Sequence, residues 1–261
     1  MQRRLSVFLA KAIGIDTVDV SNLRRLPGGA SRETWALDVH YVRDGQATQL
    51  SLVLRRDPPK ASVHGQRRDE FLLLQAAAAT GVAVPAVRWL ADEVDTLGAP
   101  FFLMDRIEGE TIARRLLRDE EYAGARRVMT AQLGRALAAI HRIDRQRCDL
   151  SFLAEPTADE TPAQSELERY QQIHRAIAPD PHPAFELAFR WLAQRLPSGC
   201  ERVVVHGDFR IGNVIFGPEG VRSILDWELA HVGDPMEDLA WMCVRSWRFG
   251  SDDKPAGGIG T

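Results

Sequence analysis

The sequence predicts an α+β protein built as two lobes, a small sheet-rich lobe over residues 1–104 and a mostly helical lobe over residues 105–261. Three observations lead to this prediction. Short runs rich in β-branched residues, bounded by turn residues, crowd the first lobe. The segments with helical periodicity gather in the second lobe. Among them lies a hairpin of apolar strands with polar residues at its strand ends, where buried polarity needs a partner.

Composition is that of an ordinary globular protein, since 45% of the 261 residues are hydrophobic and 26% are charged. The net charge of −3 gives no basic excess, so nucleic acid is not an expected partner. The three cysteines, Cys148, Cys200 and Cys243, fit neither a disulfide framework nor a CxxC metal motif, which favours a reducing compartment. No run approaches the roughly 20 apolar residues of a membrane span, and Lys11 interrupts the stretch that is similar to a signal peptide. We therefore expect a cytoplasmic protein without a membrane; the sequence does not indicate its oligomeric state.

The first lobe is expected to hold strands over residues 18–26, 34–43, 49–56 and 100–104, with an extended connector over 82–90. A glycine-rich turn over residues 27–32 separates the first two strands. It is either an ordinary hairpin loop or a loop whose backbone N–H groups approach phosphates with no Cβ in the way. A helix over residues 67–79 follows the third strand and carries Phe71, Leu74 and Ala78 at core spacing.

The second lobe is expected to begin with a helix over residues 111–117. The clearest helix covers residues 129–143, where apolar residues recur at the helical period: Met129, Leu133, Leu137 and Ile140. Two more helices are predicted over residues 165–178 and 183–196, with aromatic residues assigned to the core: Phe185, Phe189 and Trp191. A last helix is predicted over residues 236–247, with one apolar face: Leu239, Cys243 and Trp247.

The remaining strands enclose the most informative stretch of the chain. Residues 203–205 form an apolar strand that runs into His206-Gly207-Asp208, and Asn213 precedes a second apolar run. Turn residues 217–220 lead to a third strand that delivers Asp226 at its end. A cation held by Asn213 and Asp226, with Asp208 left free as a base, would account for all three polar groups beside apolar strands.

This pattern points to phosphoryl transfer, which needs metal to neutralise phosphate charge and a base to orient the attacking hydroxyl. Magnesium prefers oxygen ligands, so an amide and a carboxylate suit it. The D-x-x-x-x-N spacing of Asp208 and Asn213 matches a kinase catalytic loop, in which the Asp faces the substrate hydroxyl. His206 is then a structural residue of that loop, and the hairpin's alternative explanation is a chance Asp–Asn pair.

The segments HGDFRIGNVIF and ILDWELAHVGDP together resemble the aminoglycoside phosphotransferase family, which is similar to protein kinases in fold. Within that family, the sequence looks most like the phosphotransferase domain that some proteins carry beside an acyl-CoA dehydrogenase. The resemblance implies ATP and Mg²⁺ as cofactors. Members usually continue with more helices that help build the acceptor pocket, so it also implies that this chain lacks its C-terminal helices.

The resemblance also implies nucleotide-binding roles in the first lobe. Gly28, Gly29 and Ser31 match the family's loop over the phosphates, although Arg32 stands where Asn is usual. Arg55 takes the place of the kinase lysine and would grip phosphate, held by Glu70 on the following helix. The alternatives are a solvent-facing arginine and an acid favoured by the helix dipole. Backbone groups near Asp105 and Ile107 would bind the adenine edge.

Two further carboxylates follow Asp226. Glu228 could hold a second metal or form a salt bridge, and Asp234 is expected to cap a turn over residues 231–235 rather than touch substrate. The function implied is ATP-dependent transfer of phosphate to a hydroxyl of a small molecule. The alternatives are a non-catalytic kinase-like module that partners an acyl-CoA metabolic enzyme and a protein kinase; the absence of an A-P-E motif after Asp226 disfavours the latter.

Overall fold

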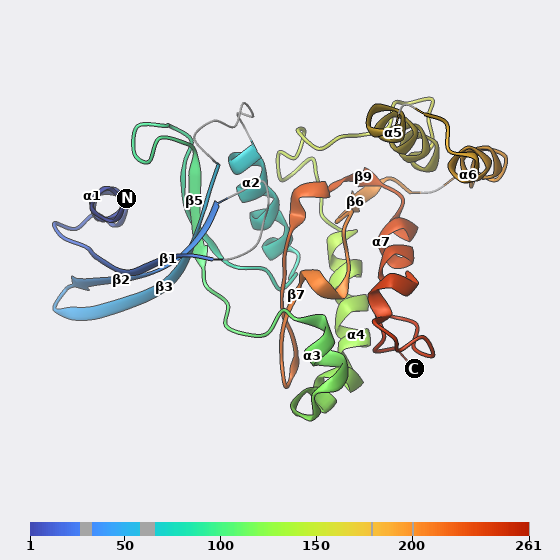
Figure 1. Cartoon of the computed structure of the whole chain (residues 1–261). Coiled ribbons are helices and arrows are strands. Elements are labelled where there is room, and N and C mark those ends of the chain that lie inside the picture. Colours follow the sequence, from blue (N-terminus) through green and yellow to red (C-terminus); the bar gives the residue numbers. More distant parts are fainter. Residues whose placement is uncertain (27–32, 58–65, 179, 200, 261) are drawn as a thin grey trace.

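A computed structural model describes residues 1–26, 33–57, 66–178, 180–199 and 201–260. Figure 1 shows a sheet-rich part joined to a helical part. The helices are α1 (Gln2–Ile13), α2 (Gln66–Ala79), α3 (Ala113–Arg118), α4 (Ala123–Ile140), α5 (Pro162–Ile177), α6 (Pro183–Ala193) and α7 (Pro235–Met242). The strands are β1 (Asp19–Arg25), β2 (Glu33–Arg43), β3 (Gln46–Arg56), β4 (Val87–Ala91), β5 (Phe101–Asp105), β6 (Val203–Val205), β7 (Val214–Gly217), β8 (Gly220–Ile224) and β9 (His231–Gly233).

The first lobe is a five-stranded antiparallel sheet in the order β1-β2-β3-β5-β4, with α1 on one face and α2 on the other (Figure 1). Alternation along β3 explains how both faces are filled, because successive side chains of a strand point to opposite sides. Leu52 and Leu54 join the cluster under α1, whereas Val53 between them joins the cluster of α2. The helices therefore cover a sheet that is apolar on both faces, as the strand runs predict.

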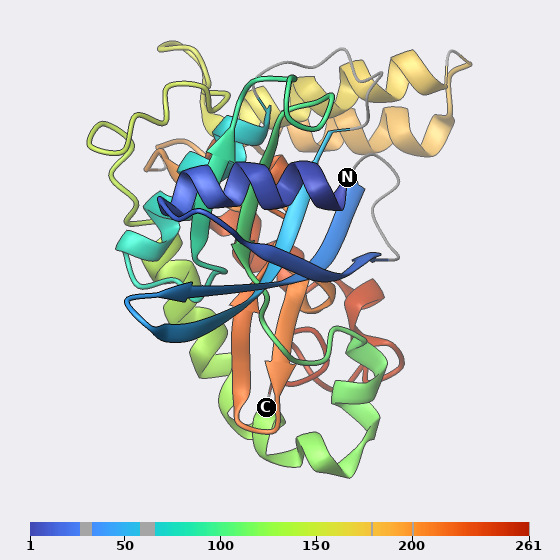
Figure 2. The ribbon, with the colours of Figure 1, turned by 90° about the vertical axis from the view of Figure 1, so that its left-hand side faces the viewer.

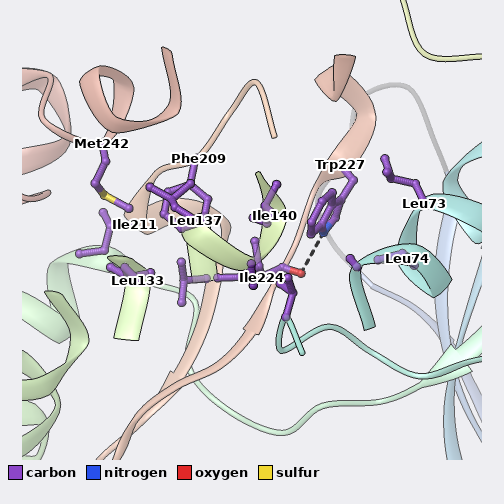
Figure 3. Close-up of a cluster of buried hydrophobic side chains, with 14 of the residues drawn as sticks. Leu73, Leu74, Leu133, Leu137, Ile140, Phe209, Ile211, Ile224, Trp227 and Met242 are labelled. Carbon is purple, nitrogen blue, oxygen red and sulfur yellow. Dashed lines mark hydrogen bonds between the residues drawn. The ribbon is translucent and has the colours of Figure 1, made fainter. Parts of the chain in front are cut away.

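The apolar stripe of α4 forms the centre of the second lobe. All four of its predicted core residues, Met129, Leu133, Leu137 and Ile140, are buried. Figure 3 shows Leu133, Leu137 and Ile140 beside Ile224, which belongs to the β7–β8 hairpin, and Trp227, which follows it. The hairpin that carries the polar strand ends is thus seated on the longest helix of the lobe.

Figure 2, which turns the molecule by 90°, shows that α5 and α6 run side by side at the edge of the molecule. The prediction that α6 contributes aromatic residues to the core is wrong. Phe185 is 50% exposed, Trp191 is 53% exposed, and no residue of α6 is buried. Amphipathic periodicity shows that a helix has an apolar face but does not say what that face meets.

Three local predictions are also corrected. Ala78 is exposed, and α2 instead buries Leu73, Leu74, Ala76 and Ala77. The last helix ends at Met242 and buries Asp238 and Met242, so the predicted face of Leu239, Cys243 and Trp247 is not its core face. Residues 231–233 form strand β9, which pairs with β6, and not a turn. This strand of three residues is too short to show a sequence period that would identify it.

No helix among the described residues is long and apolar enough to cross a membrane. The division of the lobes at residues 104 and 105 stays a prediction; β5 ends at Asp105, beside it.

The α4 core yields a stability prediction. We expect Leu137→Ala to lower the free energy of unfolding by about 2–5 kcal/mol, because it removes a buried side chain and leaves a cavity. Leu187→Ala is the matched control, since Leu187 is 70% exposed on α6 and should cost less than about 0.5 kcal/mol. Urea denaturation measures both. Equal losses in the two variants would contradict this view of the core.

Candidate active site

The loop between β6 and β7 brings Asp208 and Asn213 into direct contact. The Asn213 side-chain amide donates to the Asp208 backbone oxygen at 2.9 Å and to its carboxylate Oδ2 at 2.6 Å. A short 3₁₀ turn, Ile211–Asn213, closes the loop, and Ile211 is buried beneath it. The predicted base and the predicted metal ligand are therefore neighbours that fix each other's orientation.

His206 ties this loop to the strand that leads to Asp226. Its Nε2 lies 3.0 Å from the carbonyl oxygen of Leu225, and its Nδ1 accepts a hydrogen bond from the Asp208 backbone N–H at 3.2 Å. The carbonyl can only accept, so the ring is the neutral Nε2–H tautomer. Burial lowers the pKa of His206, and the nearby Asp238 carboxylate only partly opposes this effect. A neutral, fully buried ring agrees with the structural role that the sequence predicts for His206, and that role stays a prediction.

Asp226 follows β8 in a left-handed backbone conformation, with φ 66° and ψ 62°. The Leu225 N–H donates to the Asn213 carbonyl oxygen at 2.8 Å, which brings the start of the hairpin and its end together. Among the described residues, no donor is bonded to the Asp226 carboxylate. The Asn213 amide nitrogen is occupied by Asp208, so its oxygen remains for a cation. This carboxylate and amide oxygen are a donor set that suits Mg²⁺.

Glu228 lies two residues farther on, exposed in the 3₁₀ turn Trp227–Leu229. Its role as a second metal ligand stays a prediction. Asp234 is the N-cap of α7, and its side chain accepts a hydrogen bond from the Met236 N–H at 2.9 Å. The side chain thus bonds to a backbone N–H as the sequence predicts, but it caps the start of α7 and not a turn over residues 231–235.

The sequence analysis missed Asp238, a fully buried carboxylate on α7. It accepts hydrogen bonds from the backbone N–H groups of His206 and Gly207 at 2.9 and 3.0 Å, and His141 Nε2 lies 3.0 Å away. Gly207 has a φ of 79°, and a Cβ there would lie 2.3 Å from the Leu229 carbonyl oxygen. The loop therefore needs both the buried acid and a glycine. An acid among the apolar residues of α7 was the available signal.

Two more residues that the sequence analysis missed contact the Asp208 carboxylate. Arg210 Nε lies 3.1 and 3.2 Å from its two oxygens, and Trp241 Nε1 donates to Oδ1 at 2.6 Å. The Arg210 guanidinium lies over the Trp247 ring, 4.7 Å from its centroid. The basic residue two positions after Asp208 could have been noticed from sequence, whereas the contact from α7 depends on the fold.

In the first lobe, Arg55 and Glu70 form the ion pair that the family resemblance implies, at 2.8 Å. Glu70 also pairs with Arg67 at 2.7 Å, and Arg67 pairs with Asp57 at 2.9 Å. Arg67 is 1% exposed, so it needs both carboxylates. The four side chains alternate in charge and join the end of β3 to α2. The sequence analysis missed Arg67 and Asp57.

The other residues predicted to bind the nucleotide differ in how the structure places them. Gly28, Gly29 and Ser31 lie outside the described residues. The Asp105 N–H donates to the Ala86 carbonyl oxygen at 2.9 Å, so it is not available to an adenine. The Asp105 side chain pairs with Arg88 at 2.7 Å. No hydrogen bond to another described residue occupies the backbone groups of Ile107, which remain candidates for the adenine edge.

A cavity of about 390 Å³ lies beside the loop between β6 and β7, lined by Gly207 of that loop and by residues of α5 and of α7 with its flanks. Trp241 also lines it, so the side chain that donates to Asp208 faces the cavity as well. The apolar part of its wall consists of Pro162, Ala163, Tyr170, Ala240, Trp241 and Val244. Its carboxylates are Glu166, Asp234 and Glu237.

The buried His206 yields a pH prediction. Because its pKa is lowered in the folded state, the unfolded chain takes up a proton that the folded chain refuses when the pH falls through about 6.5. The free energy of unfolding should therefore decrease as the pH falls below about 6.5. In His206→Gln this fall should be shallower than in the parent, by up to about 1.4 kcal/mol per pH unit. His182→Gln, at an exposed position, should keep the parental slope in urea titrations. An unchanged slope in His206→Gln would contradict the assignment.

Comparison with known proteins gives the chain its family. Residues 22–261 match the family described as "Phosphotransferase enzyme family". Mouse acyl-CoA dehydrogenase family member 10 is 32% identical over 248 residues, which cover 93% of this chain and 22% of that protein. A probable acyl-CoA dehydrogenase of Arabidopsis thaliana, IBR3, is 28% identical over 83% of this chain and 27% of its own length. The chain thus spans less than a third of these relatives.

Solved structures show the same fold. A Ralstonia eutropha JMP134 protein assigned as an aminoglycoside phosphotransferase matches at a TM-score of 0.77 and 24% identity, covering 100% of this chain and 77% of that one. Macrolide 2′-phosphotransferase MphH from Brachybacterium faecium matches at a TM-score of 0.61 and 18% identity, covering 99% and 79%. These likenesses confirm the predicted two-lobe, kinase-like α+β fold. By its sequence match over residues 22–261, the chain belongs to the phosphotransferase enzyme family.

Proposed function

We propose that the protein transfers the γ-phosphate of ATP to a hydroxyl group of a small molecule. The observation that supports this most is the bonded network of Asp208, Asn213 and the segment ending at Asp226, which gathers one base candidate and two oxygen ligands. A neighbour of the same fold is a ternary complex of APH(2″)-IIa with streptomycin and ATP, and others are GDP complexes. We favour ATP over GTP as the phosphate donor, and a competition assay between ATP and GTP tests that choice.

In this proposal Asn213 and Asp226 hold Mg²⁺, which neutralises phosphate charge when bound. Arg55 grips a phosphate, and Glu70 with Arg67 keeps its guanidinium in place. Asp208 accepts the proton of the acceptor hydroxyl while the oxygen of that hydroxyl forms a bond to the γ-phosphorus. The bond from that phosphorus to the β-phosphate oxygen breaks, and ADP leaves. Positioning and charge neutralisation supply most of the rate, with the base contributing about 10²–10⁴.

The cavity beside Asp208 is the proposed acceptor site. Its three carboxylates already have partners. Arg169 donates to both oxygens of Glu166 at 2.8 and 2.6 Å, and Asp234 caps α7. Glu237 lies 3.1 Å from His231 Nε2. Burial is the largest single influence on His231 and would lower its pKa, but the hydrogen bond and charge of Glu237, together with the Leu229 carbonyl and the charge of Glu166, outweigh it and raise that pKa.

With these charges paired, the cavity offers an acceptor mainly hydrocarbon wall. A polycation would find few unpaired carboxylates there, so we favour an alcohol on a largely apolar body, such as a hydroxylated acyl compound. The names of the relatives, which are acyl-CoA dehydrogenases, agree with an association with acyl metabolism.

The second candidate is a non-catalytic module that partners an acyl-CoA metabolic enzyme. The same relatives favour it, because the chain spans only 22% of the mouse protein. The joint presence of Asp208, Asn213 and Asp226 argues against it, since a binding module has no need of a base beside two metal ligands. Release of ADP from MgATP by the purified chain separates the two candidates.

Replacement of the base gives the sharpest activity prediction. Asp208→Asn should lower phosphate transfer by about 10²–10⁴, because the amide cannot accept the hydroxyl proton. The dissociation constant for MgADP should stay within about twofold, since Asp208 holds neither metal nor phosphate in this scheme. Asp95→Asn, at an exposed position, is the control and should match the parent. Parental turnover in Asp208→Asn would remove Asp208 from the proposed role.

The metal ligand is tested through binding. Asp226→Ala should weaken nucleotide binding in the presence of Mg²⁺ by roughly tenfold or more and leave binding in EDTA unchanged, because only the metal-mediated part is lost. Titration calorimetry with ADP, with and without Mg²⁺, measures both values. If the parent binds ADP equally well in EDTA, the assignment of Asn213 and Asp226 fails.

A further inference from the structure

Trp241 lies in the last turn of α7 and is the residue through which this helix reaches the Asp208 side chain. Its indole Nε1–H donates to Asp208 Oδ1 at 2.6 Å, and the residue is 37% exposed. The same ring lines the cavity beside the loop between β6 and β7, together with Gly207. One side chain therefore touches both the candidate base and the space proposed for the acceptor.

The contacts on Asp208 come from two directions. Arg210 and Asn213, which belong to the loop itself, bond to the carboxylate at 3.1 and 2.6 Å. Trp241 bonds to it from a different element, on the cavity side. Since a carboxylate turns easily about its terminal bond, donors from one side alone leave its orientation loose, whereas donors from two elements fix it.

Helix α7 is itself fixed to the loop. Asp238, three residues before Trp241 and thus on the same helical face, accepts hydrogen bonds from the backbone N–H groups of His206 and Gly207. The helix therefore holds the loop backbone through Asp238 and the carboxylate through Trp241. This rigid support makes Trp241 able to set the direction of Asp208 rather than follow it.

We propose that Trp241 is the positioning residue of the acceptor side. Its N–H holds the Asp208 carboxylate in the orientation that receives the acceptor's proton, and its ring is the wall against which the hydrocarbon next to the reacting hydroxyl lies. This inference rests on the proposed function. It adds that orientation of the base and seating of the acceptor depend on one indole.

The hydrogen bond is tested without catalysis, by NMR of the protein labelled with ¹⁵N-tryptophan. The chain has six tryptophans, and Trp241→Phe assigns the indole signal of Trp241 by its loss. Asp208→Ala should shift that proton upfield, because its charged acceptor is gone, and Asp208→Asn should shift it less. The signals of Trp89 and Trp191 should keep their parental positions, which also shows that the variants fold. A Trp241 proton that stays in place in Asp208→Ala overturns the proposal.

The consequence for the reaction is tested by ADP release from MgATP, with water as the acceptor. Trp241→Phe keeps an aromatic wall and removes only the N–H. We expect its kcat to fall roughly 10- to 100-fold, because the base is misdirected, while KM for MgATP stays within about twofold. Trp191→Phe, the same substitution at an exposed site on α6, should match the parent.

The outcomes of this assay separate the inference from the proposed function. An active parent with an equally active Trp241→Phe overturns the role of Trp241 and leaves the proposed function intact. Another outcome is a parent that releases no ADP while the Trp241 indole proton still shifts in Asp208→Ala. That result overturns the proposed function, and with it the catalytic role of the contact between Trp241 and Asp208. A lower kcat in Trp241→Phe, with parental kcat in the control Trp191→Phe, supports the inference.

Discussion

The buried carboxylate of Asp238 is the constraint on which the rest of the site depends. It is fully shielded from solvent and accepts the N–H groups of His206 and Gly207, so it replaces the water that this turn would otherwise need. With the turn held, the His206 ring can bridge Asp208 to Leu225, and the loop and the end of the β7–β8 hairpin become one unit. Without these donors the carboxylate would be a buried charge with no hydrogen-bond partner, which is costly. Helix α7, the loop and the hairpin are therefore linked energetically as well as in space.

The first lobe uses the same principle with opposite charges. Arg67, buried between Asp57 and Glu70, has its charge balanced within the protein, and Glu70 turns its other oxygen to Arg55. A single arginine on β3 would be free to point into solvent; an alternating row of charges keeps it in one place. Buried charges thus organise both candidate regions, through ion pairs in the first lobe and through backbone N–H donors to Asp238 in the second.

Local patterns were enough to predict much of this. The spacing of Asp208 and Asn213 and the period of the α4 stripe need only neighbours along the chain, and the pair of Arg55 and Glu70 followed from the resemblance to a family. Asp238 and Trp241 were missed because each acts on a residue that only the fold brings near. Arg67 lies three positions before Glu70 on the same helix, but its second partner, Asp57, is brought near by the fold. The aromatic residues of α6 were placed in the core because an apolar helix face looks the same whether or not another element covers it. The phosphate-covering role of the glycine-rich residues 27–32 stays a prediction.

The most direct test of the central claim, that two oxygen ligands and one separate carboxylate converge on a metal–nucleotide complex, is a crystal structure with Mg²⁺ and a non-hydrolysable ATP analogue. The account predicts a magnesium ion about 2.1 Å from the side-chain oxygens of Asn213 and Asp226, with the γ-phosphate facing Asp208 and no bond from Asp208 to the metal. A metal bound elsewhere, or coordinated by Asp208 in place of Asp226, would contradict it.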